Sequence, residues 1–258
     1  MNVLLLTEPG DPALNALHAA LLADLGPGGV LHLTSADLHR STWTYRQGNA
    51  QHVTLRAPGG HRVTLGPGDA VVQRLGNFLP PQFAAAPARD RTYAEMETLA
   101  LWMSWLALAP CVVLPSLGSL TAFGPATPPA LALSAACAAG LPTGHGAWSS
   151  RRPPVVGASG PGDAAVEHTA LVVAGEVLNA PDPVYAPALR RLARDSEQTL
   201  LSVSFARAPG GDALPGTRHG WVVRSVGTDP DLRDARLAHE VARAIVRAGW
   251  VQESAVPA

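Results

Sequence analysis

The chain has 258 residues, of which 47% are hydrophobic, and its formal net charge is −1 at pH 7. A chain of this length can bury one large core or two small ones, and its balanced charge argues against nucleic acid or an anionic membrane surface as a partner. All 19 basic residues are arginine, which excludes mechanisms that need a lysine of this chain, such as a phosphate-loop lysine or a lysine Schiff base.

No segment of the sequence has the length and hydrophobicity of a membrane-spanning helix. The most apolar stretch, residues 99–114, is interrupted by a serine and a proline and falls short of the roughly 18 apolar residues that a span requires. The first residues lack a basic region and lead into Glu8, so we expect a first strand rather than a signal peptide. A cytoplasmic location is the resulting expectation.

Strand and helix signals alternate over the first 34 residues. Residues 2–7 are a continuous apolar run of the kind found in a strand covered on both faces. Asp11 is placed to cap a helix that has Pro12 in its first turn and ends at Gly26. Residues 30–34 predict the next strand. Because crossovers of this kind are right-handed, we expect these strands to be parallel.

The next segment alternates polar and apolar residues, which predicts an antiparallel excursion. Its three expected strands are residues 43–46, 52–56 and 62–65, with Pro58-Gly59-Gly60 as the turn between the last two. Residues 69–75 then return to the parallel sheet. Arg74 and Asn77 follow at the carboxyl end of that strand, where open α/β sheets place their ligands.

Residues 92–110 predict a tryptophan-rich helix. Thr92 and Glu95 have the spacing of a capping box, so we expect the helix to begin at Thr92. Its second half is apolar nearly all round, which predicts that it is interior, with Trp102 and Trp105 in the core.

The region after this helix completes the predicted elements. Residues 111–114 predict a strand and residues 129–140 a second helix. The C-terminal part predicts a hairpin, two further antiparallel strands and two helices; the ranges are 166–173 and 176–178 for the hairpin, 201–207 and 221–226 for the strands, and 185–197 and 234–248 for the helices. Gly249 is the expected stop of the last helix. Cys111 and Cys137 fall in elements predicted to be buried, which argues against a disulfide framework or a cysteine metal site.

The composition predicts two units. Residues 144–162 are rich in Gly, Pro, Ser and Arg and form the expected linker. The predicted fold is therefore an α/β domain over residues 1–143, with a mainly parallel sheet and helices, followed by a smaller α+β unit with an antiparallel sheet over residues 163–258.

Short motifs spread over most of the chain carry a resemblance to a known family. In the first half they are Arg74 after a buried strand, Thr92-Tyr93-Ala94-Glu95 opening a helix, Ala109-Pro110 before a strand, and a helix ending in Ala139-Gly140-Leu141-Pro142-Thr143. These motifs resemble the front half of ATP-grasp ligases, and are most similar to the group that installs amide or ester crosslinks in ribosomal peptides. Residues 172–177 and 225–232 resemble the hairpin of the nucleotide-binding lobe and the strand and exit loop that carry the last metal ligands.

Departures from the family pattern affect ATP binding most. Pro129 aligns with one phosphate-contacting lysine of the family, and the other has no counterpart because the chain lacks lysine. The metal-binding Glu and Asn of the exit strand align with Ser225 and Gly227, and the preceding acid falls near Ser202 or Ser204. Mg²⁺ needs hard oxygen ligands, normally carboxylates. Residues 144–166 also leave room for only one short strand where the family has a nucleotide-covering lid.

Five residues are candidates for a substrate- or anion-binding site: Arg74, Asn77, His219, Arg224 and Asp229. Arg74 can bind a carboxylate or phosphate through two hydrogen bonds, or it neutralises the end of its strand. Asn77 also fits a turn. The other three surround the predicted exit loop, where a solvated rim is the alternative. No catalytic residue and no metal ligand are assigned.

Two functions remain. The first is a reduced, non-catalytic ATP-grasp-like protein that uses no cofactor and binds a peptide or a ligase as its partner. The second is an active ATP- and Mg²⁺-dependent carboxylate-amine ligase, in which arginine replaces lysine and acids such as Asp212, Asp229 or Asp231 hold the metal. The first hypothesis is favoured because lysines and paired acids are missing.

Overall fold

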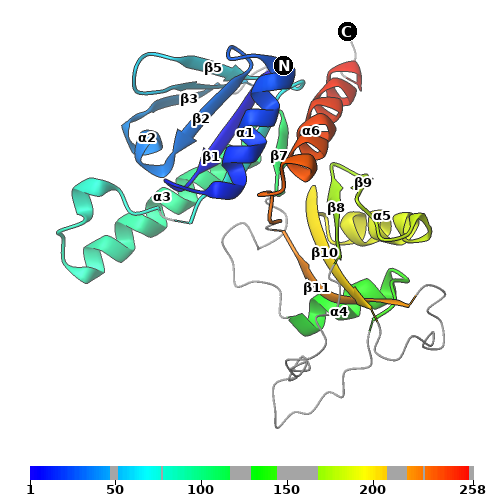
Figure 1. The fold of residues 1–258 in the computed structure, drawn as a ribbon. Helices are drawn as coiled ribbons and strands as arrows, with labels where there is room; N and C mark the ends of the chain where they lie inside the picture. The colour runs from blue at the N-terminus through cyan, green and yellow to red at the C-terminus, as the bar shows by residue number, and fades with distance from the viewer. Residues whose placement is uncertain are drawn as a thin grey trace.

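The structure is a computed structural model that describes residues 1–46, 52–76, 78–116, 129–143, 168–207, 220–228 and 230–255. The strands of this part form three sheets, with helices packed between and around them (Figure 1). Asn77, His219 and Asp229, three of the candidate site residues, lie outside the described residues.

The first sheet is parallel, as predicted, and has the strand order β2-β1-β6-β7. Its strands are β1 (Val3–Thr7), β2 (Val30–Thr34), β6 (Ala70–Arg74) and β7 (Val112–Leu114). Every residue of β1 is buried, which explains its continuous apolar sequence. Between β1 and β2 lies α1 (Pro12–Leu25), whose N-terminus is capped by Asp11 and whose C-cap Gly26 has a φ of 72°, both as expected.

Two layers cover this parallel sheet. On one face α1 packs with α6 (Ala235–Ala255), which crosses back from the C-terminal end of the chain. On the other face lie α3 (Ala88–Leu108) and a three-stranded antiparallel sheet. That sheet consists of β3 (Thr42–Arg46), β4 (His52–Arg56) and β5 (Arg62–Leu65), in this order, and confirms the predicted excursion. Gly59 and Gly60 make the β4–β5 turn with φ of 90° each.

Helix α3 begins one turn earlier than predicted. It starts at Ala88, and the Thr92 hydroxyl donates to the Ala88 carbonyl over 3.0 Å instead of capping the helix. The proposed capping box is therefore wrong, because a threonine inside a helix can satisfy its hydroxyl on the preceding turn. The 3-10 turn η1 (Pro81–Phe83) precedes the helix.

The second half of α3 is buried on one face only. Trp102 and Trp105 are buried, as predicted, but Leu101 and Leu108 are 54% and 41% exposed. The apolar residues on the outer side of this helix thus lie at the surface of the chain, and our prediction of a wholly interior half was wrong.

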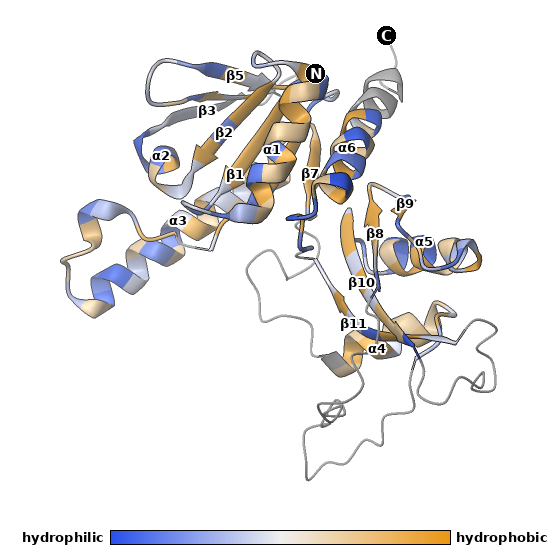
Figure 2. Cartoon of the chain, in the orientation of Figure 1, coloured by the Kyte–Doolittle hydropathy of each residue, from blue (hydrophilic) through white to orange (hydrophobic). Residues whose placement is uncertain are grey.

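The C-terminal sheet is separate and antiparallel, also as predicted. Its order is β11-β10-β8-β9, formed by β8 (His168–Val173), β9 (Glu176–Leu178), β10 (Leu200–Arg207) and β11 (Trp221–Gly227). One face packs on α4 (Pro129–Ala138) and α5 (Ala186–Asp195), the latter preceded by the 3-10 turn η2 (Pro183–Tyr185). Figure 2 shows that the strands of both large sheets are mostly hydrophobic, whereas α3, α5 and α6 also carry hydrophilic residues.

Two helices pack against strands and helices of the other predicted unit, which the sequence did not indicate. Helix α4, expected beside the N-terminal sheet, packs instead against β11 and α5. Helix α6, expected in the C-terminal unit, shares a core with α1 and β1. The predicted linker, residues 144–162, lies outside the described residues, so the domain boundary stays a prediction. Among the described helices, none combines the length and the hydrophobicity that crossing a membrane requires.

The two cysteines differ in exposure, which gives a simple test of the fold. Burial, and secondarily the nearby charge of Asp69, raises the pKa of the Cys111 thiol to about 12, whereas Cys137 is exposed, contrary to our expectation. Thiolate is the reactive form. We therefore expect a thiol reagent at about pH 8 to modify one thiol of the native chain and a second only after denaturation. The Cys137→Ser variant should not react while folded; equal reaction rates of both thiols would contradict the placement of Cys111.

Candidate functional site

A cavity of about 470 Å³ lies at the carboxyl edge of the parallel sheet. Its lining comes from the segment after β1, the end of β6, the residue after β7 and the end of β11: Glu8, Pro9, Gly10, Asp11, Pro12, Gln73, Arg74, Leu75, Gly76, Pro115 and Thr228. In the strand order β2-β1-β6-β7, the connection from β1 runs outward to β2, and the connection from β6 runs outward in the opposite direction to β7. The cavity therefore sits at the topological switch point, the place where open α/β sheets bind ligands.

Arg74 lies in this lining, as the sequence predicted, and its guanidinium is held on two sides. Its Nε is 3.1 Å from Oδ2 of Asp11, and its Nη1 donates to the Pro230 carbonyl over 3.0 Å. Both side chains of the ion pair are largely buried, at 22% and 13% exposure. Since Asp11 also caps α1, Arg74 ties the start of α1 to the segment that follows β11.

Glu8, the first residue after β1, reaches across the cavity edge. Its Oε1 accepts a hydrogen bond from the Gly76 amide over 2.7 Å, and its Oε2 accepts one from the Ser35 hydroxyl over 2.8 Å. These contacts fix the carboxylate between the end of β6 and the start of α2 (Ser35–Arg40).

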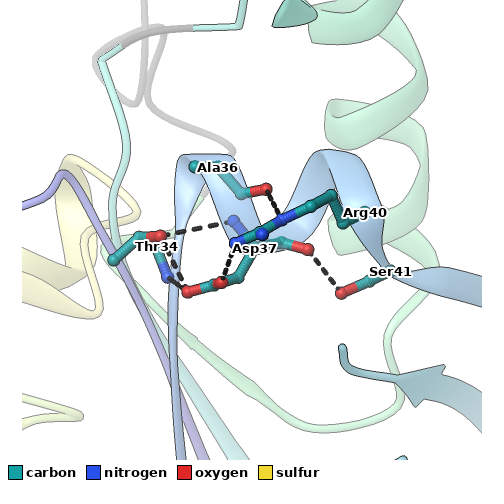
Figure 3. Close-up of polar contacts among 5 residues, drawn as sticks. All are labelled: Thr34, Ala36, Asp37, Arg40 and Ser41. Carbon is teal, nitrogen blue, oxygen red and sulfur yellow. Dashed lines mark hydrogen bonds and ion pairs between the residues drawn. The ribbon is translucent and has the colours of Figure 1, made fainter. Parts of the chain in front are cut away.

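A capping box formed by Thr34 and Asp37 begins helix α2, whose first residue is Ser35; Figure 3 shows the contacts of Thr34 and Asp37. The Thr34 hydroxyl accepts from the Asp37 amide, and Oδ2 of Asp37 accepts from the Thr34 amide over 3.1 Å. Arg40 donates to Oδ1 of Asp37 over 2.8 Å. Burial opposes ionisation of Asp37, but the hydrogen bonds from Thr34 and Arg40 outweigh it and lower the pKa of this carboxyl. The ionised box keeps α2, and with it the Ser35 hydroxyl, beside Glu8.

Gln73, a residue of the lining, has a buried side-chain atom without a hydrogen-bond partner among the described residues. Its side chain is 2% exposed, and its Oε1 is buried without a hydrogen-bond partner in the described part of the chain. Buried acceptors in native structures are almost always paired. An unpaired acceptor in a residue that lines a cavity is thus a candidate contact for a ligand.

Two histidines lie behind this edge of the sheet. Nε2 of His32 is 2.9 Å from Oγ1 of Thr7, and the rings of His32 and His18 are 4.9 Å apart. Burial lowers the pKa of both, and the neighbouring His18 lowers that of His32 further, although Asp37 and Asp11 oppose this. Both rings are therefore neutral at neutral pH and add no positive charge to the cavity.

Arg224, the other described candidate, lies outside this lining. It sits in β11 at a register shift, where Ser204 of β10 faces Ser225 and Phe205 faces Val223. A bulge of this kind re-aims a side chain, so Arg224 belongs to the C-terminal sheet rather than to the cavity beside Arg74.

Beside Arg224, the residues that pair across β10 and β11 are neutral. Ser204 faces Ser225, and Ser202 faces Gly227, with the Ser202 hydroxyl donating to the Gly227 carbonyl over 3.3 Å. In the alignment made from the sequence, these are the positions expected to match the metal-binding side chains of the family. Hydroxyl groups alone do not fit a Mg²⁺–nucleotide complex, which needs carboxylate oxygens. Within the described ranges, no three His, Cys, Asp or Glu side chains gather as a metal site.

The sequence pointed to one of the cavity's polar residues and missed the others. Arg74 was found because it ends a buried strand. Glu8 and Gln73 have the same kind of signal, a polar residue at or just beyond the end of an apolar run, and could have been found in the same way. Ser35, the partner of Glu8, is not itself in the lining. Its position could have been predicted only by recognising α2, which begins with a capping box of Thr34 and Asp37, with Asp in the place of Glu.

The fold that positions these residues is ATP-grasp-like. Over 95% of this chain and 99% of the other, the structure is similar to the macrocyclase MdnB from Microcystis aeruginosa, with 15% identity and a TM-score of 0.59. It is similar to the ATP-grasp ligase PsnB in a complex with precursor peptide PsnA2 and AMPPNP, with 13% identity, 96% and 98% coverage and a TM-score of 0.65. No protein-family model and no curated protein matches the sequence.

A third neighbour is a RiPP-associated ATP-grasp ligase from Chryseobacterium gregarium in complex with ADP and a leader and core peptide. It shares 10% identity with this chain, covers 100% of it and 98% of its own length, and has a TM-score of 0.58. The resemblance read from the sequence thus holds at the level of the fold.

Proposed function

We propose that this protein binds a peptide through its ATP-grasp-like fold and does not itself carry out ATP-dependent ligation. The second half is supported by the pairing of Ser202 and Ser204 with Gly227 and Ser225. These neutral groups stand where our sequence alignment expects the acids that hold a metal–nucleotide complex. The absence of lysine adds to this, since bound phosphates would have only arginine as a fixed cation.

Peptide binding is supported by the neighbours and by the cavity. Three of the similar ligases are described in complexes with precursor, leader or core peptides. In this chain the cavity at the switch point of the parallel sheet is lined by charged and polar groups from several segments. A partner ligase that shares the peptide is compatible with this role.

The alternative, an active carboxylate-amine ligase, is favoured by one observation: the match extends over 98–99% of the length of the ligases MdnB and PsnB. Of its proposed metal ligands, Asp231 is described, and its two oxygens accept from Nε of Arg233 over 2.8 and 2.9 Å. These hydrogen bonds hold the pKa of the Asp231 carboxyl at about 2. The carboxylate is therefore already engaged by a cation. Asp212 and Asp229 lie outside the described residues.

Calorimetric titration of the full chain with ATP and Mg²⁺ tests the non-catalytic half of the proposal. We expect no binding in the micromolar range, because the charges of a triphosphate are not matched by fixed cations and metal-holding carboxylates. Micromolar binding that requires Mg²⁺ and is lost in Arg224→Ala would contradict the non-catalytic half and favour the ligase alternative. The Arg243→Ala variant, which changes an exposed arginine of α6, is the matched control.

A further inference from the structure

Two histidine rings lie against each other at one edge of the parallel sheet. His18 belongs to α1 and His32 to β2, which is the first strand in the order β2-β1-β6-β7. The ring centroids are 4.9 Å apart, and the ring planes are tilted by 58°. Both residues are partly buried, so solvent still reaches them. The pair is therefore open to a small ligand from solution.

The geometry of the two rings fits two imidazoles that bind the same metal ion. A histidine nitrogen lies about 2.0–2.1 Å from Zn²⁺, which puts each ring centre roughly 3.2 Å from the ion and the two centres about 5 Å apart at the tetrahedral angle. The ion lies in the plane of each ring that binds it, so the planes must cross, as tilted rings allow and parallel stacked rings do not. Burial lowers the pKa of both histidines, so at neutral pH each ring is neutral and has a nitrogen lone pair.

A hydrogen bond on the other side of His32 supports this role. Thr7 is 1% exposed, and its hydroxyl oxygen lies 2.9 Å from Nε2 of His32. Histidines that bind metals usually donate their second N–H to a neighbouring oxygen, which fixes the tautomer and the orientation of the ring. When Nε2 donates to Thr7, the lone pair of the His32 ring is on Nδ1, and this is the nitrogen that is left for an ion.

We propose that His18 and His32 together bind one divalent ion of the zinc type, such as Zn²⁺, Ni²⁺ or Cu²⁺. Imidazole suits these ions, whereas Mg²⁺ takes oxygen ligands. The carboxylates of Asp11 and Asp37 favour positive charge at His32, since both act to raise its pKa. The described residues do not supply a third His, Cys, Asp or Glu ligand, so water completes the coordination and the ion exchanges with solution. Such an ion joins α1 to β2, and the site is separate from the proposed peptide-binding function.

Titration of the untagged full chain with Zn²⁺ at about pH 7.5 tests the proposal. We expect one ion per chain to bind in the micromolar range, weaker than in sites with four protein ligands. Long-range ¹H–¹⁵N NMR spectra of the imidazoles should show a shift at Nδ1 of His32 and at one nitrogen of His18. Saturating Zn²⁺ should raise the melting temperature by a few degrees, because the ion binds only the folded chain. Mg²⁺ at the same concentration should do neither.

Variants assign the binding to this pair. His18→Gln removes one ligand and leaves the contact between Thr7 and His32 in place, and it should weaken Zn²⁺ binding about tenfold or more. His32→Gln keeps a side-chain N–H for Thr7 and should have the same effect. His61→Gln is the matched control, because His61 is an exposed histidine between β4 and β5, and it should leave Zn²⁺ binding and the rise in melting temperature unchanged.

Other results would overturn the assignment. Equal losses of affinity in His18→Gln and His61→Gln would mean that Zn²⁺ binds exposed histidines without preference. An equal response to Mg²⁺ would indicate oxygen ligands in place of the imidazoles. If the parent chain does not bind Zn²⁺ at micromolar concentration, or if the imidazole shifts appear at other histidines, the two rings only pack against each other. The NMR shifts are measured on the parent chain, so they decide the question even where a variant does not fold.

Discussion

Replacing Trp102 by alanine should lower the free energy of unfolding by about 3–5 kcal/mol, the usual range for removing a buried tryptophan. Trp102 is 2% exposed. Its ring stacks on Trp43 with centroids 5.0 Å apart and meets the edge of Trp105 at 4.9 Å. Such aromatic pairs add stability beyond their buried area. Because these rings join α3, β3 and the parallel sheet, the cavity left by the substitution cannot be closed by moving one side chain.

Urea unfolding of Trp102→Ala and of a matched variant measures this effect. Leu101→Ala removes a large side chain from the next position of the same helix, but Leu101 is 54% exposed. We expect it to change the free energy of unfolding by less than about 1 kcal/mol. Equal losses in the two variants would mean that the helix is not oriented as described, and an unchanged midpoint in Trp102→Ala would place this helix outside the core.

The parallel sheet could be predicted because its strands are short continuous apolar runs separated by helix signals. Residues 2–7 and 30–34 flank a helix whose cap, Asp11, and stop, Gly26, are both readable. The antiparallel C-terminal sheet was equally readable, since Leu201, Val203 and Phe205 alternate with serines in β10. In these places the local pattern and the tertiary packing demand the same residues.

Predictions failed where the deciding partner is distant in the sequence. The apolar sequence of α3 does not reveal that only one face meets the small sheet, so Leu101 and Leu108 were wrongly placed inside. Likewise, nothing local in α4 indicates that it packs on β11, a strand some eighty residues further along the chain. The strand order of a sheet and the faces of its helices arise from long-range pairing, which a single sequence does not record.

The candidate site divides in the same way. Arg74 was identified from its position at a strand end, but its pairing with Asp11 and the Pro230 carbonyl changes its expected role. That pairing depends on the segment after β11 returning to the parallel sheet. The predicted site residues Asn77, His219 and Asp229 remain predictions. A basic residue at a strand end therefore indicates that a site is there, but not whether the site prefers an anion or a cation. That preference depends on the groups that the fold places beside the basic residue.

The substitution Gly249→Val should destabilise the chain by about 1–3 kcal/mol, the usual cost of forcing extra atoms into a packed contact. We expected Gly249 to end the last helix, but α6 continues through it to Ala255. Gly249 is buried, and a Cβ there would lie 2.6 Å from the Gly68 carbonyl oxygen and 2.8 Å from Cε of Met1. Met1 can move aside, whereas the Gly68 carbonyl belongs to the backbone just before β6. Glycine is therefore required by close packing and not by a turn.

Gly249→Ala should cause the same clash in weaker form. Its loss in the free energy of unfolding is smaller because the better helix propensity of alanine offsets about 1 kcal/mol. Gly28→Ala is the control, because nothing lies within 4 Å of a Cβ at Gly28, and we expect it to leave the melting temperature unchanged or slightly higher. Since α6 and α1 share one core, the loss in Gly249→Val should appear in the unfolding of the whole parallel-sheet layer, measured by hydrogen exchange in β1. A valine variant as stable as the parent would show that α6 does not approach Gly68, and that its predicted end at Gly249 was correct after all.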